Sequence, residues 1–287
     1  MNIIGKPNVG KSTLMNAMIG ENLSIITSKA QTTRHRILGI VNGEDFQIVY
    51  SDTPGILEPG YKMQEYMLKS ARGAISDADI LLLVTDTEEN TEIPGDVTAK
   101  LRKLSVPLLV LINKIDLSNG EQVKRLIKDW NAALPAATVI PISALEKFNL
   151  DKVFALILEN LPESPPFYPK DELTDKSERF FVSEIIREKI LLHYQQEIPY
   201  SVEVVVESYR DSGKIINISC LIYVERDSQK GILIGHRGRG LKRVGSEARA
   251  DIERFLGKKV FLETRVKVKK DWRNDGRFLK QSGYNPA

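Results

Sequence analysis

The chain has 287 residues, of which 42% are hydrophobic and 28% charged, a composition typical of soluble globular proteins and a length that suggests about two domains. This composition excludes a mainly disordered chain, and the single cysteine, Cys220, excludes an internal disulfide scaffold. No apolar run approaches the roughly 18 residues that cross a bilayer, and Met1–Gly5 lacks the basic start of a secretory signal. We therefore expect the protein to lie in the reducing cytoplasm.

The net charge of +3 conceals two chemically different halves. Four prolines at 162–169, followed by acidic residues, predict an extended linker over 163–176 that separates domains at 1–162 and 177–287. Residues 1–176 contain 19 Lys+Arg against 23 Asp+Glu, a net charge of −4, whereas the remaining residues contain 22 against 15, a net charge of +7. Within 230–280 the counts are 16 against 6, so the second half has a strongly basic C-terminal part.

The first half alternates short β-rich runs with helical stretches. Its first strand, Met1–Ile4, is unusually short, and we expect that a few residues preceding it are missing from this sequence. The apolar runs 80–84 and 108–112 are continuous, which is typical of strands buried on both faces of a parallel sheet. This pattern predicts an α/β domain with a mostly parallel, doubly wound sheet. Further strands are predicted at 37–42, 46–52, 80–86, 107–113 and 138–141, with helices between them, for example at 121–134 and 150–160.

The second half predicts an α+β domain. A helix at 178–194 precedes two β-rich runs, 201–209 and 215–225, which a turn at 210–213 joins into a hairpin. Two helices at 228–234 and 240–256 then flank a glycine-rich turn, and a strand at 260–269 follows.

The strongest motif follows the first strand and opens a helix. It matches the phosphate-binding loop, in which glycines turn backbone N–H groups toward a phosphate and the helix N-terminus adds positive potential. Lys11 would reach the β- and γ-phosphates, and the Ser12 hydroxyl would bind Mg²⁺. The alternative is a tight glycine turn before a structural helix. The predicted phosphate-binding residues are Gly5, Lys6, Pro7, Asn8, Val9, Gly10, Lys11, Ser12 and Thr13.

The residues at the end of the apolar strand near 113 indicate which nucleotide base the site would bind. Asp116 can accept two hydrogen bonds from the N1–H and 2-amino group of guanine, a donor pair that adenine does not offer. Asn113 would hold the loop and contact the base, while the Lys114 stem packs along the ring. After the next predicted strand, Ser143-Ala144-Leu145 would supply a backbone N–H to the guanine O6.

Two further segments complete the predicted phosphate site. In Asp52-Thr53-Pro54-Gly55, Asp52 would hold a Mg²⁺-bound water and the Gly55 N–H would meet the γ-phosphate. The segment Gln31-Thr32-Thr33-Arg34-His35 is predicted to be a switch loop, in which Thr33 rather than Thr32 completes the Mg²⁺ shell. Lys11, Thr33 and Gly55 would then contact the transition state.

A second glycine motif lies in the basic half. Gly235-His236-Arg237-Gly238, between two predicted helices, would let a nucleic-acid backbone approach closely. The apolar residues 232–234 would line a groove beneath the bases, and a basic solvated face is the alternative. The order helix, strand, strand, helix, GxxG, helix, strand resembles a type II KH domain. The predicted RNA contacts are Ile234, Gly235, His236, Arg237, Gly238, Arg239, Lys242 and Arg243.

Another basic cluster, at 267–280, includes Trp272. This side chain could stack on a base, or it could pack the C-terminal tail onto the domain, which we slightly prefer.

In combination, GKPNVGKS, QTTRH, DTPG, NKID and SAL resemble the motifs of translation-factor-related GTPases over roughly the first 160 residues. The QTTRH form and the C-terminal domain narrow the resemblance to the Era-like subfamily. The resemblance implies a slow GTPase switch that uses GTP, GDP and Mg²⁺ and binds 16S rRNA near its 3′ end. It also implies a role in maturation of the 30S subunit and a coupling of that role to cell growth and division. A monomer in the cytoplasm, with peripheral association with the inner face of the cell membrane, is expected as well.

The catalytic group is left open. Ile56 follows Gly55, and an aliphatic side chain cannot orient the attacking water, so no general base is identified and His35 is not proposed as one. Asn8 has two interpretations that we weigh equally. In some relatives of this family an Asn at this position coordinates a monovalent cation such as K⁺, whereas more simply Asn8 stabilises the loop turn.

Two other functions are weighed against the switch. In one, the protein is an RNA chaperone whose nucleotide domain is structural, which Lys11, Ser12 and Asp52 disfavour. In the other, it is an ATP-driven remodelling enzyme, which Asp116 disfavours.

Overall fold

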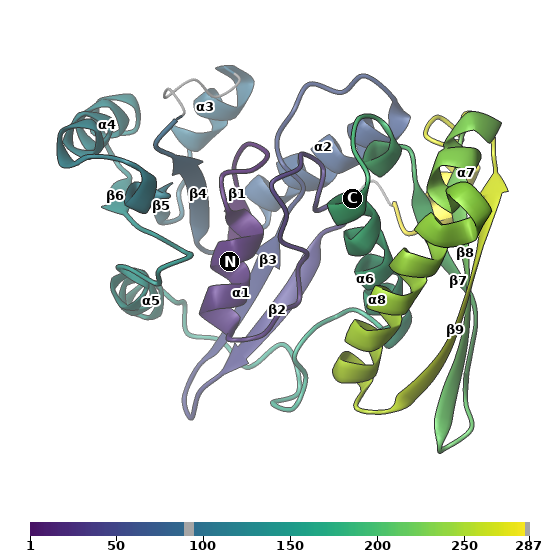
Figure 1. The fold of residues 1–287 in the computed structure, drawn as a ribbon. Helices are drawn as coiled ribbons and strands as arrows, with labels where there is room; N and C mark the ends of the chain where they lie inside the picture. Colours follow the sequence, from purple (N-terminus) through teal and green to yellow (C-terminus); the bar gives the residue numbers. More distant parts are fainter. Residues whose placement is uncertain (89–94, 285–287) are drawn as a thin grey trace. The chain divides into compact units, whose positions relative to one another are not determined.

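The structure, a computed structural model, describes residues 1–88 and 95–284, and they form two compact units. Of the described residues, the first unit contains 1–60 and 64–175, and the second contains 61–63 and 176–284. Each unit has its own sheet and its own hydrophobic core, so each is described by itself (Figure 1).

The first unit is built on a six-stranded sheet with the order β2-β3-β1-β4-β5-β6. The pair β2–β3 is antiparallel and every other pair is parallel, as predicted for a mostly parallel α/β sheet. The short strand β1 lies between β3 and β4, in the interior of the sheet. The strands are β1 (Asn2–Ile4), β2 (Ile37–Asn42), β3 (Gln47–Asp52), β4 (Leu81–Asp86), β5 (Leu108–Asn113) and β6 (Thr138–Pro141).

Helices cover both faces of this sheet. Every residue of β4 and β5 is buried, which explains why both strands are continuously apolar. One core cluster joins alternate residues of β4 and β5 to α2, α3 and α4, and Figure 1 shows α1 in front of the sheet and α2 behind it. The helices are α1 (Lys11–Ile19), α2 (Lys62–Ser76), α3 (Gly95–Leu101), α4 (Gly120–Ala133) and α5 (Leu150–Glu159).

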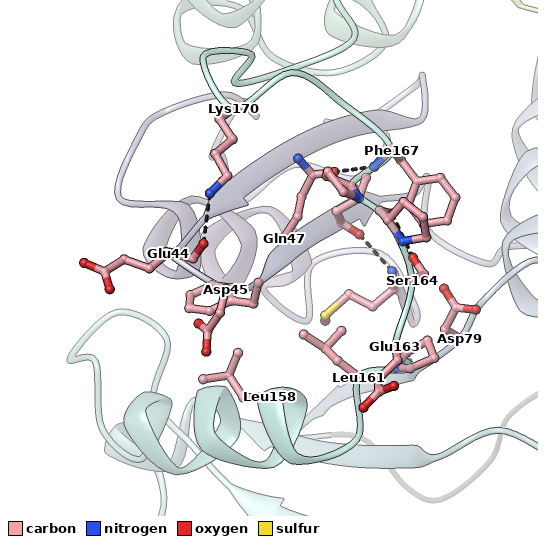
Figure 2. Close-up of a pocket in the computed structure, with 16 residues that line it drawn as sticks. Glu44, Asp45, Gln47, Asp79, Leu158, Leu161, Glu163, Ser164, Phe167 and Lys170 are labelled. Carbon is pink, nitrogen blue, oxygen red and sulfur yellow. Dashed lines mark hydrogen bonds between the residues drawn. The ribbon is translucent and has the colours of Figure 1, made fainter.

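Part of the predicted linker is hydrogen-bonded to the edge strand β2. The Ile40 N–H donates to the carbonyl of Leu173 at 2.8 Å, and the Thr174 hydroxyl donates to the carbonyl of Leu38 at 2.6 Å. Earlier in the same segment, the amides of Phe167 and Tyr168 donate to the side chain of Gln47, as Figure 2 shows for Phe167. This segment therefore covers an edge that would otherwise expose unpaired backbone groups. Its start lines a cavity of about 650 Å³ together with the β2–β3 turn and the end of α5 (Figure 2).

The second unit is an α+β fold with the element order expected of a type II KH domain. In its three-stranded sheet, β8 pairs antiparallel with β7, as predicted for a hairpin, and parallel with β9. The core lies between this sheet and helices α6, α7 and α8. The elements are α6 (Glu178–His193), β7 (Glu203–Asp211), β8 (Ile215–Val224), α7 (Asp227–Ile234), α8 (Arg239–Leu256), β9 (Lys259–Val268) and α9 (Gly276–Gln281).

Several elements have no counterpart among the ranges predicted from the sequence. Helices α2 and α3 fall in gaps for which no range was given, and α9 was not predicted. Three short 3-10 turns complete the described elements, η1 (Ile115–Leu117), η2 (Ile198–Tyr200) and η3 (His236–Gly238), and two of them lie within predicted functional loops.

Candidate functional site

The predicted phosphate loop connects the C-terminal end of β1 to the N-terminus of α1. Gly10 is the N-cap of α1 with φ 95°, and it has no side chain that could cap the helix. A Cβ on Gly10 would lie 2.2 Å from Asn113 Nδ2, and a Cβ on Gly5 would lie 2.1 Å from the carbonyl oxygen of Val84. Glycine is therefore required at both positions, and the first N–H groups of α1 stay available for an anion.

The lysine and serine of the loop stand at the start of α1. The Lys11 ammonium donates to the carbonyl of Lys6 at 2.7 Å, so it lies over the loop that would enclose the phosphates. Thr13 follows in the same helical turn and is half-buried, whereas Asn8, at the tip of the loop, is exposed and has φ 66°.

Three oxygen-bearing side chains from separate segments meet beside Lys11. The Ser12 hydroxyl donates to Asp52 Oδ2 at 2.7 Å, the Thr33 hydroxyl donates to the same oxygen at 3.2 Å, and the two hydroxyls are 2.8 Å apart. Asp52 Oδ1 is buried, and no described residue gives it a hydrogen bond of ordinary geometry. Burial raises the pKa of Asp52, and the charge of Lys11 opposes this shift. An unsatisfied carboxylate oxygen beside two hydroxyls is a donor set that fits Mg²⁺, which prefers oxygen ligands.

The predicted switch loop leads directly into β2. Thr32 donates to the carbonyl of Lys29 at 2.6 Å and pairs with the hydroxyl of Thr27, so Thr33 is the threonine placed on Asp52. In the same loop Gln31 has φ 57°, Arg34 is buried and His35 is half-buried.

The segment after β3 is packed against the phosphate loop. The Thr53 hydroxyl donates to the carbonyl of Ile3 at 2.7 Å, and a Cβ on Gly55 would lie 2.7 Å from the backbone nitrogen of Pro7. The Ile56 N–H donates to the carbonyl of Gly5 at 3.0 Å, while its side chain is buried in the core. Because this side chain is aliphatic and buried, it offers no group that could orient water.

Asn113 links the phosphate loop to the two loops predicted to bind the base. Its Nδ2 donates to the carbonyl of Val9 at 2.8 Å, and its Oδ1 accepts the Ala144 N–H at 2.9 Å. Lys114 has φ 60° and its ammonium pairs with Asp86 at 2.6 Å, which fixes the start of the loop that carries Asp116, the 116 loop. Asp116 is exposed, as is Leu145, whereas Ser143 is buried. The predicted base-binding residues therefore converge on one edge of the sheet, with the Asp116 carboxylate open to solvent.

In the second unit the GxxG loop forms a sharp turn between α7 and α8. Gly235, Arg237 and Gly238 have φ values of 71°, 52° and 75°. His236 and Arg237 are exposed, and α8 begins at Arg239 with Gly238 as its N-cap. The first turns of α8 carry the other predicted basic contacts, Arg239, Lys242 and Arg243, and all three are exposed. The open N–H groups at the start of α8 and these basic side chains favour the binding of a phosphate group.

A groove of about 390 Å³ begins at this loop and runs between α8 and β9. The prediction that residues 232–234 line the groove is wrong for Leu233, which is completely buried in the core. Ile232 and Ile234 are not among the described residues that line this groove. The lining residues are Gly238, Leu241, Lys242, Gly245, Ser246, Arg249, Leu262 and Thr264. The sequence contains a signal for the six that precede β9, because their spacing from Gly238 places them on one helical face.

Trp272 packs the C-terminal tail rather than offering a stacking surface. The indole is completely buried, its Nε1–H donates to the carbonyl of Ser201 at 3.0 Å, and its ring meets Phe278 edge to face. The preferred interpretation of this residue is therefore correct.

Comparisons with known proteins match both halves of the chain. A family model described as 50S ribosome-binding GTPase matches residues 1–114, and a KH domain model matches residues 197–273. GTPase Era of Alkaliphilus metalliredigens (strain QYMF) is 46% identical over 286 residues, which is 98% of this chain and 97% of that protein. The chain belongs to the Era family of GTPases. GTPase Era of Clostridium kluyveri (strain ATCC 8527) is 44% identical over 284 residues, again 98% of this chain and 97% of that protein.

Solved Era structures have the same fold. The crystal structure of a single-residue variant of Aquifex aeolicus Era bound to GDP·AlF4⁻ gives a TM-score of 0.94 at 37% identity and covers 99% of this chain and 97% of the other. A crystal structure of Era in complex with MgGDPNP and nucleotides 1506–1542 of 16S ribosomal RNA gives the same scores and coverage.

Proposed function

We propose that this Era-family GTPase is a guanine-nucleotide switch that binds the small-subunit ribosomal RNA near its 3′ end and assists assembly of the 30S subunit. The observation that carries the proposal is the presence of two preformed loop arrangements in one chain. One is a phosphate loop that Asn113 joins to the loops predicted to bind the base, and the other is a GxxG loop that opens into a groove. The Era structure with MgGDPNP and 16S nucleotides supports it, because a protein with the same fold binds both ligands.

In the nucleotide site each residue has a proposed task. The N–H groups at the start of α1 hold the phosphates, and Lys11 leaves the Lys6 carbonyl to reach the β- and γ-phosphates. Ser12, Thr33 and Asp52 would hold Mg²⁺, with Asp52 acting through a bound water. When bound, Mg²⁺ neutralises charge on the phosphate oxygens. Lys11, Thr33 and the Gly55 N–H would contact the transition state.

Guanine selection depends on Asp116. Its exposed carboxylate can accept both donors of the guanine edge, while Asn113 keeps the 116 loop and the 143–145 loop attached to the phosphate loop. A backbone N–H of residues 143–145 would donate to the guanine O6. This arrangement disfavours the alternative of an ATP-driven enzyme, because adenine lacks the donor pair.

Hydrolysis is slow in this proposal, because Ile56 supplies no group that orients water. The left-handed conformation of Asn8 fits a turn residue, while its exposure leaves the side chain available to K⁺. Hydrolysis rates in KCl and in NaCl decide between the two roles: a faster rate in KCl supports K⁺ coordination, and equal rates leave Asn8 as a turn residue.

The chain would act as two modules, 1–162 and 177–287, joined by residues 163–176. RNA would lie along the groove between α8 and β9, with its backbone at residues 235–243. The predicted monomer, its cytoplasmic location, its contact with the inner face of the membrane and its coupling to growth and division are part of the same proposal. Within the described residues, each helix is too short or too polar to cross a bilayer.

A pair of substitutions in the groove tests the RNA part. Arg237→Ala with Lys242→Ala should weaken binding of an RNA with the sequence of 16S nucleotides 1506–1542 about tenfold or more, because the two cations lie at the GxxG loop and on the wall of the groove. GTP hydrolysis without RNA should not change, because the nucleotide site belongs to the other unit. Lys124→Ala with Lys128→Ala, two lysines on α4, is the charge-matched control, and an equal loss of RNA affinity in that variant would refute the groove assignment.

A further inference from the structure

The loop that would grip RNA has a support outside the GxxG motif, at the end of helix α6. Tyr194 is the C-cap of α6, and its ring packs against the core of the second unit. Its hydroxyl donates to the carbonyl of Leu233 at 2.6 Å, in the last turn of α7. The last carbonyls of a helix have no partner inside that helix, so this hydroxyl satisfies one of them from another element.

The residues that follow the loop pack against the same hydroxyl. Gly240 lies in the first turn of α8, and a Cβ on it would lie 2.6 Å from Tyr194 Oη and 3.0 Å from the Leu233 carbonyl oxygen. Gly235 is also closely packed, since its Cβ would lie 3.0 Å from the Gly240 nitrogen. The two ends of the loop, residues 233 and 240, therefore converge on one oxygen atom at the end of α6.

The residue before Tyr194 holds α8 farther along. His193 Nε2 and Glu247 Oε2 are 2.5 Å apart, and the other oxygen of Glu247 accepts from Arg243 Nε at 3.1 Å. The end of α6 thus contacts the helix before the GxxG loop and the helix after it. It also orients Arg243, one of the basic side chains predicted to meet RNA.

We propose that Tyr194 is a positioning residue for RNA binding, which holds the GxxG loop so that its backbone N–H groups and basic side chains meet the RNA phosphates together. The inference rests on the RNA-binding function proposed above. Tyr194 acts through Leu233 and Gly240 and is not itself proposed to touch RNA. Its role differs from a purely structural one, because loss of the hydroxyl should change how many phosphates the loop meets.

The test compares two tyrosine-to-phenylalanine variants of the full chain. Tyr194→Phe keeps the packed ring and removes the bond to Leu233. Tyr209→Phe is the matched control, because the Tyr209 hydroxyl also bonds to α6, at Glu178 at the other end of the helix. The probe is a labelled RNA with the sequence of 16S nucleotides 1506–1542, and its affinity is measured at several salt concentrations.

We expect Tyr194→Phe to lower the affinity about three- to tenfold, the effect of one neutral hydrogen bond. The salt dependence should also become shallower, by roughly 0.7 in log–log slope for each phosphate that the loop no longer holds. Tyr209→Phe should change neither quantity. Wild-type affinity and slope in Tyr194→Phe would overturn the inference, whereas failure of the wild-type chain to bind this RNA would overturn the proposed function itself.

Gly240→Ala gives a second and independent measurement. The new Cβ should displace the hydroxyl of Tyr194, so Gly240→Ala should weaken RNA binding at least as much as Tyr194→Phe. In the Tyr194→Phe background the added loss should be smaller, since the nearest oxygen that the Cβ meets is gone. Losses that simply add in the double variant would contradict a shared contact.

Discussion

At the scale of single residues, the nucleotide site depends on a few atoms that join loops far apart in the sequence. Asn113 is the clearest case, because its two side-chain polar atoms bond to Val9 and Ala144. It is almost completely buried, whereas Asp116, three residues later, is exposed. One residue of the motif therefore holds the site together, and the other remains available to the base.

The base preference should change when one acceptor of Asp116 becomes a donor. Asp116→Asn should weaken GTP binding roughly 100-fold or more, because a site built to pair with polar groups rejects a mismatched partner strongly. The same variant should gain affinity for xanthosine triphosphate, whose C2 carbonyl can accept from the new amide. Titration with fluorescent nucleotides measures both. Asp129→Asn, at an exposed position on α4, should leave both affinities unchanged, and unaltered GTP affinity in Asp116→Asn would contradict the assigned role.

Cys220 should be inert in the folded protein. It lies on β8, completely buried in the core, and burial raises its thiol pKa to about 12. Since this value lies above that of an unfolded thiol, the folded chain holds the thiol proton more tightly, and that contribution to stability is lost as the pH rises toward about 12. Iodoacetamide at mildly alkaline pH should label Cys220 only after denaturation with urea, and rapid labelling of the native protein would show that β8 opens readily.

At the scale of elements, the least expected contact is the one between the predicted linker and β2. Proline content indicates an extended segment, but composition carries no information on which edge it pairs with. Here the segment bonds along an edge strand that continues directly from the predicted switch loop. Extended backbone next to an unpaired edge explains why the contact forms.

Removal of one linker contact should loosen that edge. Thr174→Val is nearly isosteric and deletes the bond from the hydroxyl to the Leu38 carbonyl, worth about 1 kcal/mol. Amide hydrogen exchange at Leu38 and Ile40 should accelerate, and proteolysis within 163–175 should become faster. Thr138→Val, at the start of β6, is the control for the same chemical change. Equal exchange rates in both variants would show that the hydroxyl does not hold the linker.

Strand positions were largely predictable, since continuous apolar runs identify β4 and β5, and the predicted bounds of β2 and β6 agree with the structure. Helix α9 was missed because its six residues are too few for a periodic pattern, and its start depends on Asp275, whose side chain accepts from the amides of Arg277 and Phe278. The groove was only partly predictable. One wall follows from the spacing along α8, but the other depends on the parallel pairing of β8 with β9, which is a long-range contact.

At the scale of the whole molecule, the near-neutral charge of +3 is the sum of −4 on residues 1–176 and +7 on residues 177–287. A strongly basic protein would attract nucleic acid over its entire surface. Here the positive charge is concentrated in residues 230–280, which include the GxxG loop and helix α8. The charge separation therefore favours RNA binding by the second unit in particular.

The most direct test of a nucleotide-controlled RNA-binding protein is to crosslink the full chain to cellular RNA and sequence what is bound, first with a non-hydrolysable GTP analogue and then with GDP. We predict strong enrichment of the 3′ end of 16S rRNA with the GTP analogue and much weaker enrichment with GDP. Identical, nonspecific RNA profiles in the two states would contradict the coupling of nucleotide to RNA.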